Sequence, residues 1–163
     1  MRRPGPALSM LLLALGLAGP AGAESWGGIT PGETTRPDVE ARYGRPSRER
    51  MVTEEGRTAA EWTYVGERAP RGLDRMIVSF GLVRPQGFVA DVVRGLTLHP
   101  KPRVFTLRAI TNGWGVPDAV GTEQATGRSV LRYDAKGLLI VFDLTGQWAE
   151  VLLFAPPQRV ATP

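Results

Sequence analysis

The sequence repeats itself at a spacing of 71 residues, and this internal similarity constrains the fold more than any other feature of the chain. One gapless offset relates eight residues of the first copy to eight of the second, and at these positions aromatic residues replace aromatic residues. The first copy contains Thr35, Val39, Tyr43, Gly44, Pro46, Gly56, Arg57 and Trp62, which recur as Thr106, Ile110, Trp114, Gly115, Pro117, Gly127, Arg128 and Tyr133. Self-similarity of this kind indicates that one supersecondary unit occurs twice.

The repeated residues predict one short helix in each copy. In the first copy Thr35 is a good N-cap, and Val39 and Tyr43 are four residues apart, which places both on one helix face. Gly44 suits the left-handed position just past a helix, and Pro46 prevents the helix from continuing. Because the second copy carries the same pattern, we expect two helices of about two to three turns each.

Segments rich in β-branched and aromatic residues follow each predicted helix. Every second residue is hydrophobic in residues 76–80 and 138–142, as is typical of one buried face of a strand. These residues are Met76, Val78 and Phe80 in the first copy and Leu138, Ile140 and Phe142 in the second. Short turns between consecutive strands favour antiparallel pairing. We therefore expect an α+β fold of two tandem repeats, each a helix followed by an antiparallel three-stranded meander, with the helices packed on one side of the sheet. The predicted strands are residues 59–65, 76–80 and 89–98 in the first copy and 128–134, 138–142 and 147–154 in the second.

The start of the chain has the features of a secretory signal peptide. Arg2 and Arg3 form a positively charged start, residues 7–18 are mostly apolar, and residues 21–23 are a small-x-small cleavage sequence. The apolar run is shorter than the roughly 20 residues of a membrane-spanning helix, which is the alternative interpretation. We expect cleavage before Glu24 and a periplasmic or secreted location. The predicted organisation is a signal peptide (1–23), a first repeat (24–100), a second, degenerate repeat (101–156) and a flexible tail (157–163).

The absence of cysteine and the single histidine exclude several kinds of chemistry. Without cysteine there is no disulfide, no thiolate nucleophile and no cysteine-based zinc site. His99 lies between Leu98 and Pro100 at the end of a predicted strand, and no nucleophile motif accompanies it. Phosphate-binding glycine motifs are also absent from the sequence. We therefore expect no catalytic residue, no cofactor and no metal site, and we predict that the chain is not an enzyme.

The charge balance argues against a nucleic-acid partner. The chain has 20 Lys and Arg residues against 16 Asp and Glu residues, and removal of the signal peptide takes away Arg2 and Arg3. The densest basic stretch, residues 42–57, is interleaved with glutamates such as Glu49 and Glu54. We interpret it as a solvated mixed-charge loop, and the alternative is a weak contact with an anionic membrane surface.

Candidate partner-binding residues are aromatic or charged side chains on the predicted strands, because aromatic residues and arginine dominate protein interfaces. Arg94 and Glu150 occupy equivalent positions on the last strand of each copy, so a pairing between them is one alternative to partner binding. Trp148 shares a strand face with Glu150. Trp62 and Tyr64 alternate onto one face, and packing in the core is the alternative for Trp62.

The first copy resembles a known envelope domain. The segment Ile-Thr-Pro-Gly-Glu-Thr-Thr-Arg-Pro-Asp-Val-Glu-Ala-Arg-Tyr-Gly-Arg-Pro (residues 29–46), followed by Trp62-Thr-Tyr64 and a strand ending at Phe80, is similar to the SmpA/OmlA (BamE-like) domain. The similarity covers roughly residues 29–98, and the second copy keeps a degenerate version. A tandem pair of such units also resembles the architecture of the secreted β-lactamase inhibitor proteins, whose sheet binds a partner on the face opposite the helices.

The resemblance implies a non-catalytic exported protein that binds another envelope or secreted protein, in outer-membrane or envelope maintenance. BamE-like lipoproteins are held by an N-terminal cysteine, which this sequence lacks. We therefore expect a soluble periplasmic or secreted relative. The alternative function is a periplasmic binder of anionic lipid headgroups or of a small ligand.

Overall fold

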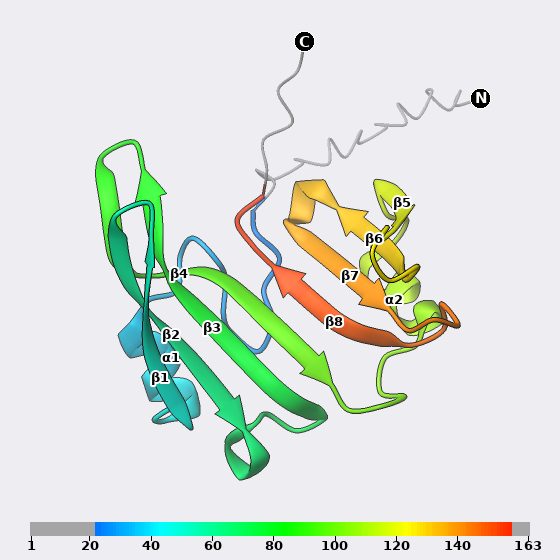
Figure 1. Ribbon diagram of the computed structural model, residues 1–163, viewed down its shortest axis with the longest axis horizontal. Coiled ribbons are helices and arrows are strands. Elements are labelled where there is room, and N and C mark those ends of the chain that lie inside the picture. The colour runs from blue at the N-terminus through cyan, green and yellow to red at the C-terminus, as the bar shows by residue number, and fades with distance from the viewer. Residues whose placement is uncertain (1–21, 158–163) are drawn as a thin grey trace, which may run out of the picture.

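The eight strands of the described residues join one antiparallel sheet, and two α-helices cover one of its faces (Figure 1). The structure is a computed structural model that describes residues 22–157. Most of the predicted signal peptide and of the predicted tail therefore lies outside the described residues. The strands are ordered β1-β2-β3-β4-β8-β7-β6-β5 across the sheet.

One helix precedes each set of four strands along the chain. The bounds are α1 (Arg36–Tyr43), β1 (Arg48–Glu54), β2 (Arg57–Val65), β3 (Leu73–Arg84), β4 (Gly87–Pro100), α2 (Leu107–Trp114), β5 (Ala119–Thr122), β6 (Ser129–Tyr133), β7 (Leu138–Phe142) and β8 (Ala149–Phe154). We refer to α1 with β1–β4 as the first half and to α2 with β5–β8 as the second half. Within residues 22–157 no helix has the length and hydropathy needed to cross a membrane.

The predicted fold class of two tandem helix-plus-three-stranded-meander repeats is wrong, although the architecture is broadly α+β. The strands form a single sheet because β4 and β8 pair in its middle, where Leu96 lies opposite Phe154 and Leu98 lies opposite Leu152. Four strands, not three, follow each helix. In the first half the missed strand is β1, an edge strand whose residues are mostly charged and exposed, so its sequence shows no buried face.

Both predicted helices are present, and each begins at the expected threonine. Before α1, the backbone N–H of Thr35 donates to the Asp38 carboxylate at 2.9 Å. Before α2, the hydroxyl of Thr106 accepts from the backbone N–H of Ala109 at 3.0 Å. Hydrogen bonds from the Thr35 side chain and backbone hold the pKa of Asp38 below its ordinary value. Such caps satisfy polar groups that the first turn of a helix leaves free.

Two buried tyrosines join the sheet to the ends of the helices in the same way in both halves. The hydroxyl of Tyr64 donates to the carbonyl of Gly44 at 3.0 Å, and that of Tyr133 donates to the carbonyl of Gly115 at 3.1 Å. The structural counterpart of Tyr133 is therefore Tyr64, not Trp62 as the 71-residue offset predicts. Burial raises the pKa of both tyrosines, that of Tyr64 to about 12.

The hydrophobic core lies between the helices and the sheet. Val39 of α1 and Ile110 of α2 are fully buried against alternate residues of the central strands, such as Val78 and Leu152. Full burial of each aliphatic side chain of this kind contributes about 1.5–3 kcal/mol. Because residues of both halves belong to one continuous cluster, the two halves are stabilised by a shared core.

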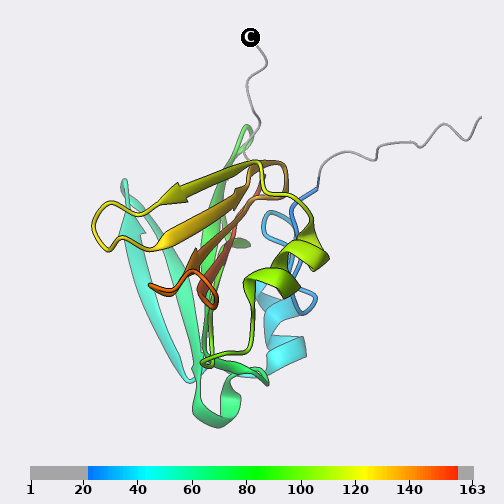
Figure 2. The ribbon, with the colours of Figure 1, turned by 90° about the vertical axis from the view of Figure 1, so that its right-hand side faces the viewer.

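The opposite face of the sheet carries no helix of the described residues. Figure 2 shows both helices on one side, while the outer strands β1, β2, β5 and β6 reach toward the other side. The uncovered face is therefore concave, and we call it the open face.

Candidate functional site

The open face carries a row of eight side chains, one from each strand. Residues opposite each other in an antiparallel sheet point to the same face, so the register defines the row. Sequence neighbours of the row, such as Met76 and Leu152, are fully buried on the helix side, which places the row on the open face. This central row is Arg48, Thr63, Ile77, Thr97, Leu153, Leu139, Arg132 and Ala119, in the order β1 to β5 across the sheet.

Valines enlarge the apolar middle of the central row in the second half. Val141 lies opposite both Val151 of β8 and Val130 of β6, and all three valines are half-buried. Leu153 is 37% exposed at the centre of the sheet. A contiguous apolar patch that faces solvent typically marks an interaction surface. We call these valines together with Ile77, Leu139 and Leu153 the apolar patch.

Pairs of arginine and carboxylate side chains surround the apolar patch. The pairs are Arg50–Glu61 (2.7 Å), Arg94–Glu54, Arg128–Glu150 (3.1 Å) and Arg132–Asp134 (2.8 Å). Exposed pairs of this kind contribute at most about 1 kcal/mol each to stability. Their consequence for binding is that most charges around the patch are already neutralised by a neighbour.

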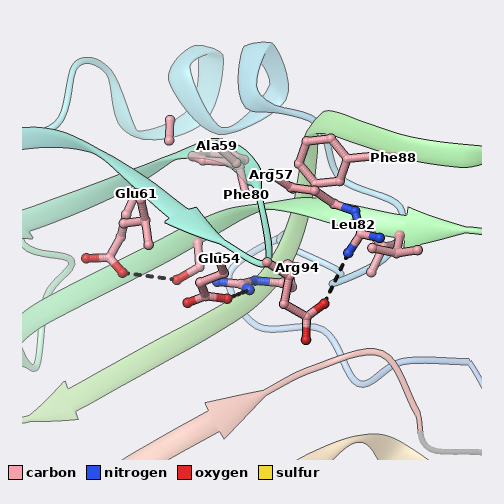
Figure 3. Close-up of a pocket in the computed structure, with 14 residues that line it drawn as sticks. Glu54, Arg57, Ala59, Glu61, Phe80, Leu82, Phe88 and Arg94 are labelled. Carbon is pink, nitrogen blue, oxygen red and sulfur yellow. Dashed lines mark hydrogen bonds and ion pairs between the residues drawn. The ribbon is translucent and has the colours of Figure 1, made fainter.

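A pocket of about 640 Å³ opens between the β1–β2 hairpin and the β3–β4 hairpin (Figure 3). Gly81 lines this pocket with a φ angle of 89°, at a place where the register of β3 against β4 shifts. A Cβ atom at Gly81 would lie 2.6 Å from the Cβ atom of Ala59 and 2.9 Å from the ring of Phe88. Glycine therefore permits both the backbone bend and the close approach of the Phe88 ring.

Each charged side chain of the pocket has an ion partner, as Figure 3 shows for Arg94 with Glu54. Arg57 likewise lies 3.2 Å from the carboxylate of Glu55. The hydrogen bond from Arg94 holds the pKa of Glu54 below its ordinary value. A carboxyl that acts as a general acid needs the opposite shift. A ligand in this pocket would therefore meet paired charges beside apolar side chains.

Arg94 and Glu150 lie at matching irregularities of the sheet. Where β4 pairs with β3, Val93 and Gly95 have partners and Arg94 between them is an extra residue. Where β8 pairs with β7, Ala149 and Val151 have partners and Glu150 between them is an extra residue. They do not pair with each other, because each has its ion partner within its own half. A β-bulge of this kind aims one additional side chain at the surface.

Trp62 and Tyr64 lie on the helix-covered face. Trp62 is 4% exposed with its ring centroid 5.1 Å from that of Phe80, and Tyr64 is fully buried. Core packing, the alternative for Trp62, is therefore what the structure shows. Neither side chain is available to a partner at the surface.

Trp148 and Glu150 line a cleft of about 610 Å³ near the end of β4, together with His99. The Nε2 atom of His99 lies 3.2 Å from the guanidinium of Arg75. Burial, followed by the positive charge of Arg75, lowers the pKa of His99. In the described part of the chain no three His, Cys, Asp or Glu side chains are grouped to hold a metal ion.

Ile77, Leu153 and Arg75, which the sequence reasoning did not select, lie on the open face instead. A signal for them exists, because alternate residues of the predicted strands point away from the core face. The alternation selects these residues only when the positions of the helices are known, because the helices determine which face of the sheet stays open.

Comparisons with known proteins identify a similar fold but no family. No family model matches the chain, and no curated protein matches it. The solved structure of a DUF4309 family protein (YjgB) from Bacillus subtilis matches with a TM-score of 0.50 and 17% sequence identity, covering 79% of this chain and 82% of that chain. At this identity the likeness concerns the fold alone, and the resemblance to SmpA/OmlA domains remains a prediction.

Proposed function

We propose that this chain is a non-catalytic exported protein that binds another envelope or secreted protein on its open face. The observation that carries the proposal is the apolar patch, which spans the middle of the sheet and has no helix of the described residues over it. Burial of such a patch against a partner is favourable at about 25 cal/mol per Å² of apolar surface. A role in outer-membrane or envelope maintenance follows from the resemblance of residues 29–98 to SmpA/OmlA domains.

A protein fits the open face better than a membrane does. The face is concave, so a flat bilayer would meet the rims formed by the outer strands before it reached Leu153 in the middle. In the basic stretch considered for headgroup contact, Arg50 and Arg57 already have carboxylate partners. A protruding loop or helix end of a protein can enter the concave face without these obstacles.

Site-specific photo-crosslinking tests the proposal with matched positions. A benzophenone amino acid replaces Leu153 on the open face in one variant and Leu107 of α2 in the other, because their exposures are similar at 37% and 40%. We expect a discrete protein adduct in an envelope extract of the producing bacterium from position 153 and none from position 107. Unlabelled wild-type protein should compete with the adduct, and unlabelled Leu153→Arg protein should not.

Two outcomes would contradict the proposal. Equal adducts from both positions would indicate non-specific contact. Absence of a protein adduct from position 153, together with salt-sensitive binding of the unlabelled chain to anionic vesicles, would favour the lipid-headgroup alternative.

A further inference from the structure

A group of hydrogen-bond donors lies directly beside the apolar patch in the first half. Arg75 precedes Ile77 by two residues on β3 and lies opposite His99 of β4. Ile77 itself lies between Thr63 and Thr97 in the central row. We call Thr63, Arg75, Thr97 and His99 the donor group.

Arg75 differs from most arginines of the open face. Among residues 22–157, the open-face arginines without a carboxylate partner are Arg75 and the edge residue Arg48, whereas the others are paired. Within the described part of the chain, the only polar side-chain contact of Arg75 is the one with His99 at 3.2 Å. Because an arginine side chain has several N–H groups and one of them meets His99, the remaining ones are free to bind an acceptor.

The contact with Arg75 also determines which ring nitrogen of His99 carries the hydrogen. A guanidinium has donors only, so the Nε2 atom of a neutral His99 accepts and its Nδ1 atom carries the hydrogen. The lowered pKa of His99 agrees with a neutral ring. The donor group therefore presents guanidinium and imidazole N–H groups beside two hydroxyls.

Three carboxylates line the cleft beside His99, and two of them are engaged with other partners. Glu150 is paired with Arg128, and Asp143 accepts hydrogen bonds from Thr145 and from backbone N–H groups. Asp74, the bulge residue before Arg75, also lines this cleft and is exposed, and within the described part of the chain it forms no ion pair with Arg75. Neither the central row nor the row of Val65, Arg75 and His99 contains an acidic residue.

We propose that the protein partner presents an acidic side chain next to an apolar ridge, with its carboxylate bound by Arg75 and His99 and its apolar side chains on Ile77, Leu139 and Leu153. This inference rests on the proposed function and specifies the chemistry of the partner. Charge-assisted bonds from a guanidinium to a carboxylate are stronger than bonds between neutral groups. They fix the orientation of a partner that the apolar patch alone would hold loosely.

Selection from a phage library of short, disulfide-closed random loops tests this inference and does not require the natural partner. Such loops protrude, so they can enter the concave face. The targets are the wild type, Arg75→Glu, Leu153→Arg and Arg108→Glu, a control that makes the same charge change on an exposed residue of α2. We expect the wild type and the control to enrich loops with Asp or Glu beside Leu or Phe. Arg75→Glu should select Lys or Arg at that place, and Leu153→Arg should enrich none of these loops.

A synthetic loop from this selection should bind Arg75→Gln about tenfold or more weakly than the wild type, and Arg108→Gln should bind like the wild type. The acidic specificity would be overturned if the wild type selected loops without Asp or Glu, or if the wild type and Arg75→Glu selected the same loops. If Leu153→Arg nevertheless failed to select these loops, protein binding at the open face would still stand. Failure to enrich any loop on the wild type would overturn the inference, whereas the crosslinking experiment decides the proposed function separately.

Discussion

The two halves of the sheet share their helix-to-sheet joints but differ in the length of their strands. In both halves a tyrosine hydroxyl binds the carbonyl of the glycine after the helix. The strands β3 and β4 have 12 and 14 residues, whereas their counterparts β7 and β8 have 5 and 6. The additional length forms the hairpin around Gly81 and Phe88 that lines the pocket. The joint is therefore common to both halves, and surface features arise where strand lengths differ.

The segments that lead into the two helices show a second difference. Gly32 in the first half and Arg103 in the second follow a proline and have positive φ angles of 89° and 64°. The left-handed region costs a non-glycine residue roughly 1–2 kcal/mol. The second half therefore retains a strained backbone position that the first half fills with glycine.

Removal of the two tyrosines should have the largest effect on stability. Tyr64→Ala and Tyr133→Ala each leave a cavity beneath a helix end and a carbonyl without its donor, at an expected cost of about 4 kcal/mol in the free energy of unfolding. Urea denaturation followed by circular dichroism measures this cost. Because the halves share one core, we expect a single transition in each variant. Two separate transitions would show that the halves unfold independently.

The hairpin that distinguishes the first half depends on Gly81. Gly81→Ala should cost about 3 kcal/mol, because the new Cβ atom meets Ala59 and Phe88 in addition to the backbone strain. Gly56→Ala is the matched control, since Gly56 has a φ angle of 75° and open space around its Cβ position. We expect about 1 kcal/mol for the control, measured by thermal or urea unfolding. Equal costs for the two variants would refute the importance of the close approach.

The tyrosine joints should make the protein sensitive to alkaline pH. The folded pKa of Tyr64 is raised from 10.0 to about 12, so the unfolded state loses its proton first and stability falls as pH rises from about 10 toward 12. Tyr64→Phe should lose about 1 kcal/mol at neutral pH through its missing hydrogen bond. It should then lose less stability than the wild type above pH 10. Urea midpoints across this range test the expectation, and parallel pH profiles would contradict it.

The smallest expected effect comes from the lead-in segments. Arg103→Gly should raise the free energy of unfolding by about 0.5 kcal/mol, because relief of backbone strain exceeds the entropy that glycine adds to the unfolded chain. The reverse change in the first half, Gly32→Ala, should lower it by about 1 kcal/mol. Thermal unfolding of both variants measures the difference. Destabilisation by Arg103→Gly would mean that the arginine side chain makes a contribution larger than its backbone strain.

Short-range patterns in the sequence predicted the helices but not the extent of the sheet. The caps at Thr35 and Thr106 and the helix ends at Gly44 and Gly115 depend on neighbouring residues, so the pattern is readable in the chain itself. Strand β1 escaped prediction because an exposed edge strand has no hydrophobic alternation. The match of Trp62 with Tyr133 was wrong because the first hairpin is two residues longer: Arg48 lies opposite Thr63, 15 residues later, whereas Ala119 lies opposite Arg132, 13 residues later.

Local sequence patterns establish which residues begin and end the helices and which strand residues can be buried, and the composition establishes that no thiol chemistry is available. Only the packed molecule shows that β4 and β8 join the halves into one sheet and that Ile77 and Leu153 face solvent while Trp62 and Tyr64 do not. The physical reason is that strands such as β7 and β8 carry apolar residues on both faces. Only the packing of both helices on the same side determines which of those faces becomes the core and which remains open to a partner.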